Sequence, residues 1–253
     1  GLSENTLKKH YVILNNMLKR AIKLKLIKFN PAQAIDPPRP EKKEAPVMSK
    51  TEYEKLLNIL KDDLLIFTFV FTDIMTGLRR SEILGLEWED VNLDNGVIKI
   101  RKRLVPVTGG LLHEKKTKTD SSRREIKISN TLISILNKYK KKHTKYRLQL
   151  GSEYNQNKNF VFCRPDGQPY RPKHYNDTLN KYLSQANLSQ DYTIHTLRHT
   201  FATINIKNGI EPKIIQEMLG HSTIATTLDI YSHVDTDMQK KAVNKLDQAI
   251  NID

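Results

Sequence analysis

The sequence contains a single cysteine, Cys163, so no disulfide bond can form within the chain. A fold held together by its own disulfides is therefore excluded. The first residues also lack the apolar core and cleavage site of a signal peptide, and we expect a cytoplasmic protein. Position 1 is glycine instead of an initiator methionine, which suggests a sequence that begins inside a longer protein.

Long hydrophobic runs are scarce as well. The most apolar stretch, residues 64–78, contains three threonines and Asp73, and it is shorter than the roughly 20 residues needed to span a bilayer. We predict a buried helix there. Neither a basic amphipathic helix nor a lipidation motif stands out, so no membrane association is expected.

Two kinds of cofactor motif are also missing. The sequence has no glycine-rich loop ending in Lys-Ser or Lys-Thr, which would hold a nucleotide phosphate. It also has no obvious carboxylate cluster of the kind used by two-metal nucleases. We therefore expect chemistry that needs neither a nucleotide nor a metal.

Positive charge, by contrast, is in excess. Lysine and arginine number 42 against 28 acidic residues, which gives a formal net charge of +14. Such an imbalance is typical of proteins that bind polyanions, and nucleic acid is the expected partner.

Helix-capping residues and a proline-rich stretch predict two units joined by a linker. From Ser3, a plausible N-cap, apolar residues recur at helical spacing in a helix expected to close at Asn30-Pro31. Residues 37–46 hold four prolines and five charges without apolar periodicity, as expected of an extended linker. We therefore predict a helical segment over 1–36, a linker over 37–47, a larger domain over 48–234 and a helical tail over 235–253.

The larger domain is predicted to be mainly α with a small antiparallel β-sheet. Ser49 and Glu52 form a capping box at its first helix. A turn at Asp94-Asn95-Gly96 leads into alternating residues 97–101, and residues 125–128 alternate in the same way. Most of the remaining signals are helical.

Three separated segments contain residues suited to chemistry. In Thr76 to Glu82, Arg79 lies where the buried helix breaks, although a surface arginine beside a helix cap is about as good an interpretation. In His195 to His199, an imidazole and Arg198 share one helical face. That pattern also fits a structural polar face or, less well, a zinc pair of His195 and His199.

The third segment joins His221, after Leu219-Gly220, to Tyr231. Tyr231 lies on one helical stripe with Ile224 and Leu228, so that by itself it would more often pack in a core than act as a nucleophile.

Taken together, these segments resemble the tyrosine recombinase family, the phage-type integrases. The resemblance covers nearly the whole chain, because the helix predicted to end at Asn30-Pro31 is similar to the last part of that family's core-binding domain. It implies a tyrosine-recombinase catalytic fold and a site-specific recombinase, most simply the integrase of a mobile element such as a phage or transposon.

The resemblance also implies roles for individual residues. Arg79 and Arg198 would be the paired catalytic arginines, His195 and His221 the assisting histidines, and Tyr231 the nucleophile. Glu82 would be a supporting carboxylate. The lysine that the family places between two strands is Lys118 in the gap-free comparison, and Lys116 is the alternative if two residues are inserted.

These residue types suit attack on a phosphodiester. Planar guanidinium groups can neutralise the charge on the nonbridging oxygens, and a lysine can protonate the leaving 5′ oxygen. Because free tyrosine has a pKa near 10, the phenol needs a base or a strongly positive site. The phosphotyrosyl ester conserves the bond energy, so strand exchange needs no ATP.

The resemblance further implies double-stranded DNA recombination sites as substrate, a homotetramer on DNA, and possible accessory factors that bend DNA or set direction. The tail over 235–253 could dock on a neighbouring protomer or pack on its own domain. Two rival functions stay open: a DNA-binding module without catalysis, and a type IB-like topoisomerase that uses the same phosphotyrosine.

Overall fold

A computed structural model of the chain describes residues 1–40, 45–107, 110–114, 123–155 and 157–231. The chain divides into two compact units, Gly1–Glu44 and Ala45–Asp253. This division falls inside the stretch predicted as a linker, residues 37–47.

The first unit consists of helix α1, Glu4–Lys23, and the 3-10 helix η1, Pro31–Ala34. The Ser3 hydroxyl accepts from the Thr6 N–H, which confirms the predicted N-cap. The helix was predicted to continue to Asn30-Pro31, and this was wrong. It ends at Lys23 because Lys25 adopts a left-handed conformation with φ of 57°, which turns the chain out of the helix.

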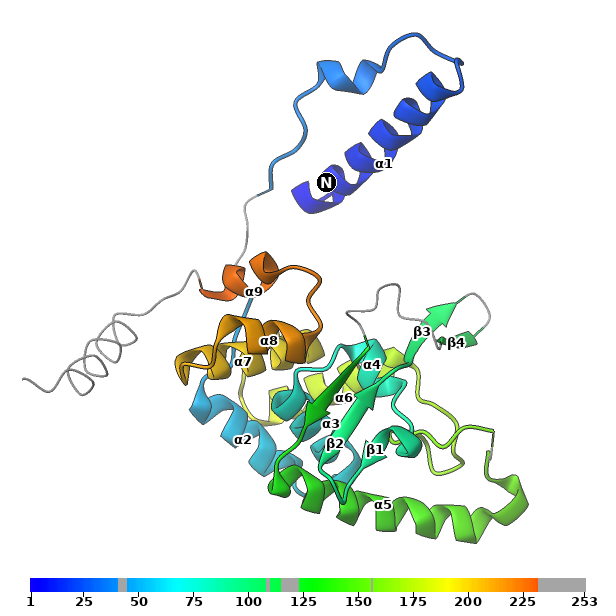
Figure 1. Ribbon diagram of the computed structural model, residues 1–253, viewed down its shortest axis with the longest axis vertical. Helices are drawn as coiled ribbons and strands as arrows, with labels where there is room; N and C mark the ends of the chain where they lie inside the picture. Colours follow the sequence, from blue (N-terminus) through cyan, green and yellow to red (C-terminus); the bar gives the residue numbers. More distant parts are fainter. Residues whose placement is uncertain (41–44, 108–109, 115–122, 156, 232–253) are drawn as a thin grey trace, which may run out of the picture. The chain divides into compact units, whose positions relative to one another are not determined.

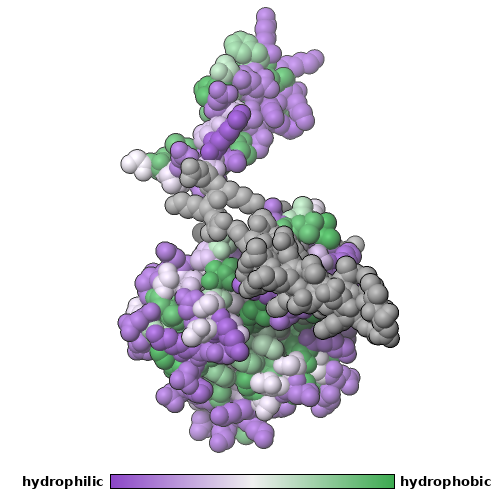
Figure 2. All heavy atoms as spheres, turned by 90° about the vertical axis from the view of Figure 1, so that its left-hand side faces the viewer, coloured by the Kyte–Doolittle hydropathy of each residue, from purple (hydrophilic) through white to green (hydrophobic). Residues whose placement is uncertain are grey.

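The apolar stripe of α1 is left uncovered by the described part of this unit. Leu7, Leu14 and Met17 are 43%, 52% and 64% exposed, and apolar patches stand out among the polar surface of this unit in Figure 2. The middle of the helix is nevertheless anchored, since the Tyr11 hydroxyl donates to the Ala32 carbonyl over 3.1 Å.

The second unit is mainly helical (Figure 1). Its helices are α2 Lys50–Leu60, α3 Leu64–Thr76, α4 Arg80–Leu84, α5 Asn130–Leu150, α6 Pro172–Gln185, α7 Ile194–Lys207, α8 Pro212–Leu219 and α9 Ile224–Tyr231, with 3-10 turns η2 Trp88–Asp90 and η4 Gly151–Glu153. The predicted capping box is present at the start of α2, where Ser49 and Glu52 bond reciprocally.

The described part of this unit also contains two small antiparallel sheets. One has the strand order β1-β2-β5 and contains Val91–Asn92, Val97–Ile100 and Arg124–Lys127, with Ile98 opposite Ile126. The other pairs β3, Arg103–Val107, with β4, Gly110–Glu114. Alternation in the sequence predicted β2 and β5, which the structure confirms, whereas β1, β3 and β4 carry weaker signals and were not predicted.

Helix α3 forms the centre of the core and contacts α2, α5, α6 and α7. Its Phe69 is fully buried and stacks on Tyr175 of α6, with ring centroids 4.2 Å apart. Burying a side chain of this size contributes about 1.5–3 kcal/mol. The predicted buried helix is thus confirmed, and its C-terminal end, beside α7 and α8, is fixed by the core.

Among the described residues, no helix is both long and apolar enough to cross a bilayer.

Candidate active site

The sequence-predicted residues lie on four elements of the larger unit. Arg79 is the N-cap of α4, Arg198 lies in α7, His221 follows the end of α8, and Tyr231 is the last residue of α9. The structure describes only the backbone of Tyr231. Lys118 and Lys116 lie outside the described residues, as does the predicted tail from residue 235.

Gly77 shapes the turn that leads to Arg79. It caps α3 in a left-handed conformation with φ of 60°. A Cβ atom at this position would lie 2.5 Å from Phe201 Cδ1 of α7 and 2.7 Å from Leu219 Cδ2 of α8. Only glycine fits both the backbone angle and the space. The missing side chain therefore lets the end of α3 approach the two helices that carry Arg198 and precede His221.

Glu82 fixes the position of Arg79. Its Oε2 accepts from the Arg79 backbone N–H over 2.9 Å, and its Oε1 accepts from Arg79 Nη1 over 2.8 Å. The Glu82 side chain is only 3% exposed, whereas that of Arg79 is 36% exposed. The carboxylate thus holds the arginine from its buried side.

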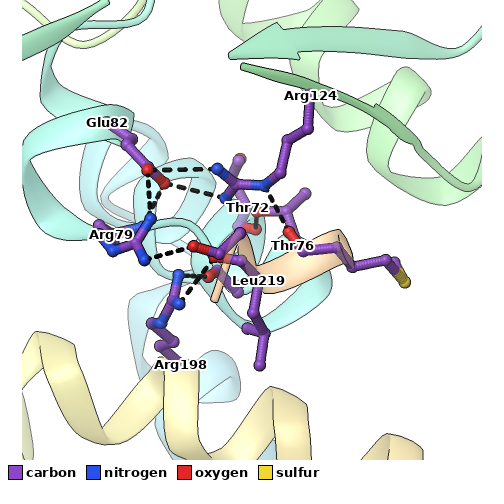
Figure 3. Close-up of polar contacts among 10 residues, drawn as sticks. Thr72, Thr76, Arg79, Glu82, Arg124, Arg198 and Leu219 are labelled. Atoms are coloured by element: carbon purple, nitrogen blue, oxygen red, sulfur yellow. Dashed lines mark hydrogen bonds and ion pairs between the residues drawn. The ribbon is translucent and has the colours of Figure 1, made fainter. Parts of the chain in front are cut away.

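Three arginines converge on the C-terminal end of α8 (Figure 3). Arg124 Nε donates to the Met218 carbonyl over 2.6 Å, Arg198 Nη2 to that of Leu219 over 2.8 Å, and Arg79 Nη2 to that of Gly220 over 2.6 Å. The last carbonyls of a helix have no partner within the helix and carry partial negative charge, so they favour cations. Three consecutive carbonyls therefore gather three guanidinium groups.

Arg198 also ties this helix end to the turn at Gly77. Its Nη1 donates to the Gly77 carbonyl over 2.6 Å, and the residue is 5% exposed. Burial and the neighbouring Arg79 lower the pKa of Arg198 to about 9. Its guanidinium remains charged near neutral pH.

The negative charge around the arginines is small. Burial alone would raise the pKa of Glu82, but hydrogen bonds and charge from Arg124, with a smaller contribution from Arg79, lower it overall, so this carboxylate is ionised. Asp73 is completely buried, and burial raises its pKa well above the ordinary value. Neither of its carboxyl oxygens has a hydrogen-bond partner among the described residues. Among the described residues, three arginine side chains thus surround the ionised carboxylate of Glu82, and this excess of positive charge favours a bound anion.

Two of the predicted histidines are held neutral. Burial, followed by the charges of Arg198 and Arg79, lowers the pKa of His221 to about 4, and its Nδ1 lies 2.9 Å from the Thr227 hydroxyl. Burial and Arg198 also lower the pKa of His195. Neutral imidazoles near pH 7 can accept a proton.

The zinc interpretation gains no third ligand among the described residues. His195 and His199 lie edge to face, with ring centroids 5.3 Å apart. The described side chains that do have metal-ligand spacing are the carboxylates of Glu87, Glu89 and Asp90. Lys102 bonds to two of them and Arg101 to the third, so cations already balance their charge.

Arg124 was not singled out from the sequence. It begins β5, and in the sequence it appears only as the end of the segment that contains Lys118. Its partner Glu82 lies 42 residues earlier, so no local spacing connects the two. Only the folded chain brings them together.

Comparison with known proteins identifies the family. Residues 46–238 match the Phage integrase family. The XerC-like tyrosine recombinase of Caldanaerobacter subterraneus is 31% identical in an alignment that covers 97% of this chain and 66% of that protein. The ICEBs1 integrase of Bacillus subtilis is 25% identical over 99% of this chain and 67% of its own length. This chain thus spans about two thirds of the length of these relatives.

A solved structure shares the fold. The Tn1549 transposon integrase, in complex with transposon right end DNA, superposes with a TM-score of 0.80 at 24% identity, over 97% of this chain and 80% of that one. The predicted tyrosine-recombinase fold is therefore confirmed. Because the family match covers most of the sequence, the chain belongs to the Phage integrase family, the tyrosine recombinases that its separated motifs predict.

Proposed function

We propose that this chain is a site-specific recombinase that cleaves and rejoins DNA strands through a 3′-phosphotyrosyl intermediate. The observation that carries the proposal is the convergence of Arg79 and Arg198 on the carbonyls of Leu219 and Gly220, directly before His221. Net positive charge at that point suits the phosphorus centre of a phosphodiester, whose charge grows in the transition state. Neither a metal nor a nucleotide is required.

In the cleavage step, the Tyr231 phenol oxygen attacks phosphorus, and the bond from phosphorus to the 5′ oxygen breaks. Arg79 and Arg198 neutralise the nonbridging oxygens with paired hydrogen bonds. The phenol proton passes to a histidine, His195 or His221, because both rings are neutral near pH 7 and can accept it.

Lys118 is the proposed general acid that protonates the leaving 5′ oxygen, with Lys116 as the alternative. His195 assists in holding the phosphate. In the rejoining step a 5′ hydroxyl from another strand attacks the phosphotyrosyl phosphorus and gives its proton to the lysine. The bond from phosphorus to the Tyr231 oxygen breaks, and that oxygen takes back a proton from the histidine. The number of phosphodiester bonds is conserved, so no external energy source is needed.

The substrate proposed is double-stranded DNA that carries paired recombination sites. Support comes from the net charge of +14 and from the Tn1549 integrase, whose structure contains transposon end DNA. We further propose that residues 1–36 are part of a core-binding domain, that 37–47 cross the duplex as a linker, and that four copies assemble on DNA with the tail from residue 235 docked in trans. A DNA-bending or directionality factor could assist.

The test is formation of a covalent adduct. The full chain is incubated, without divalent metal, with nicked DNA duplexes that carry the end sequence of the mobile element. The products are separated on a denaturing gel. The wild type is expected to form an adduct linked to the 3′ end. Tyr231→Phe, the matched control, should bind the same DNA and form none.

Three outcomes separate the rivals. If both proteins bind the end sequence and neither forms an adduct, the chain is a binding module and the proposal fails. If Tyr231→Phe still forms the adduct, another residue is the nucleophile. If the wild type relaxes supercoiled DNA without dependence on paired sites, the topoisomerase function holds instead.

A further inference from the structure

We propose that Arg124 is a positioning residue that holds Arg79 in place through Glu82 and fixes the end of α8 that precedes His221. The inference rests on the proposed function, because it assumes that Arg79 and His221 act on the phosphate. Arg124 itself is not proposed to touch DNA.

The contacts of Arg124 form a closed clamp. Its Nη1 donates to Glu82 Oε1 over 3.2 Å and its Nη2 to Glu82 Oε2 over 2.9 Å, so the guanidinium meets the carboxylate as a two-pronged pair. Its Nε donates to the Met218 carbonyl over 2.6 Å. The Arg124 side chain is 8% exposed. Such planar bidentate pairing fixes orientation as well as distance, which a lysine cannot do.

Glu82 transmits this constraint to Arg79. Each of its carboxylate oxygens accepts one bond from Arg124 and one from Arg79, the latter through Nη1 and the backbone N–H. Without Arg124, the buried carboxylate would retain bonds on one side only and could rotate away from Arg79. A displacement of about 1 Å in a group that binds the reacting centre can lower a rate about 100-fold.

Arg124 differs from the two proposed catalytic arginines in which of its guanidinium nitrogens donate hydrogen bonds to the protein. Among the contacts of the described residues, all three nitrogens of the Arg124 guanidinium donate to protein acceptors. Arg79 and Arg198 donate through Nη1 and Nη2, and their Nε atoms have no protein acceptor there. Arg79 and Arg198 therefore keep the Nε donor for a phosphate, whereas every guanidinium nitrogen of Arg124 already donates to the protein.

The position of Arg124 in the chain extends its role. It is the first residue of β5, six positions after Lys118, and β5 also contacts α8. Arg124 therefore joins the strand that follows the proposed general acid to both α4 and α8. One side chain links three parts of the site that are distant in sequence.

The first experiment measures the clamp without reference to activity. Thermal unfolding of the full chain is compared for wild type, Arg124→Gln, Glu82→Gln and the double variant. Arg124→Gln leaves a buried carboxylate underpaired, so we expect its midpoint to fall by roughly 5–15 °C. The double variant should lose much less than the two single losses added. Additive losses would overturn the inference.

The control for this experiment is Arg123→Gln, which removes an adjacent but exposed arginine and should leave the midpoint nearly unchanged. If Arg124→Gln does not fold, Arg124→Lys takes its place in the cycle. That variant keeps the positive charge and removes the planar guanidinium group that pairs with both oxygens of Glu82.

The second experiment measures the consequence for chemistry. At saturating protein, Arg124→Lys should form the Tyr231 adduct about 10- to 100-fold more slowly than wild type, with DNA affinity unchanged. The rate is then measured on DNA that carries an uncharged methylphosphonate at the scissile position. Since this substrate needs less charge neutralisation, most of the deficit should disappear. A deficit of equal size on both substrates contradicts a role through Arg79.

The two experiments keep the two proposals apart. If the wild type forms no adduct, the proposed function fails, and the unfolding cycle still decides whether Arg124 holds Glu82. If the adduct forms but the cycle is additive, the proposed function stands and Arg124 is not a positioning residue.

Discussion

Two buried polar clusters in the larger unit differ in charge. In one, Arg79, Arg124 and Arg198 surround the single ionised carboxylate of Glu82. In the other, His143 Nε2 lies 2.7 Å from Cys163 Sγ and 3.0 Å from the Tyr154 hydroxyl, and all three groups are neutral.

Burial shifts the histidines of both clusters in the same direction. It lowers the pKa of His143 as it lowers that of His221, and it raises the pKa of Cys163 to about 12. What distinguishes the clusters is the residual charge. Because the neutral groups around His143 satisfy one another, that cluster needs no ligand. The arginine cluster is left with unbalanced positive charge, so burial alone does not identify a functional site here.

Among the substitutions that test the difference between the two clusters, Arg198→Lys should have the largest effect on adduct formation. The lysine keeps the charge but cannot bond to both the Gly77 and Leu219 carbonyls and a phosphate. We expect adduct formation to slow by roughly 10²–10³-fold, about 2.7–4 kcal/mol, measured in a single turnover at saturating protein. Arg147→Lys on the exposed face of α5 is the control. A loss below tenfold would place Arg198 outside the chemistry.

His143→Leu tests the other cluster. Removing the imidazole takes one buried partner from the Tyr154 hydroxyl and one from the Cys163 thiol, which should cost about 1–3 kcal/mol of stability. Denaturant unfolding measures this loss. The adduct rate at a temperature where the variant is folded should match that of wild type. A slower rate in the folded variant would break the comparison, because it would connect the neutral cluster to catalysis.

Asp73→Asn tests whether the Asp73 carboxyl adds negative charge to the arginine cluster. Burial raises the pKa of Asp73 in the folded protein above its unfolded value, so ionisation favours the unfolded chain. Stability due to this group is full below the unfolded pKa and is lost as pH rises through the folded pKa. Asparagine removes that loss, and we expect a gain of about 1 kcal/mol at pH 7.5 and none near pH 3.5. A variant less stable at pH 7.5 would instead indicate an ionised Asp73 paired with Arg198.

The smallest effect is expected from His221→Gln. The pKa of His221 is about 4 in the folded protein, below the ordinary value of 6.5, so the unfolded chain binds more protons between these values. Wild-type stability should therefore fall as pH decreases from 6.5 to 4, and the variant should fall less steeply. Unfolding midpoints at several pH values measure both slopes. Parallel slopes would show that burial and the arginines do not depress the His221 pKa in the folded protein.

Local signals predicted much of the fold because their causes are local. The caps at Ser3 and Ser49 and the turn before β2 each depend on neighbours a few residues away. The end of α1 was missed because Lys25, a residue that rarely adopts positive φ, makes the turn.

The candidate site was predictable to a different extent. Arg79, Arg198 and His221 were located from separated motifs, and the fold brings them together. The Arg124–Glu82 pair and the raised pKa of Asp73 were not predicted, because they depend on tertiary contacts between α3, α4, β5, α7 and α8. The assignments of Lys118 and Tyr231 stay predictions, since the structure describes neither side chain.

The acceptors at the end of α8 have a consequence for how this site tolerates mutation. The groups that receive Arg124, Arg198 and Arg79 are main-chain carbonyls of Met218, Leu219 and Gly220. Every amino acid supplies that carbonyl, so no codon change at these positions can delete an acceptor. Only a shift of the helix end can do so. A single substitution can therefore remove one of the arginines but not the carbonyl that it binds. On the acceptor side, we expect substitutions to weaken these hydrogen bonds only by changing how α8 packs.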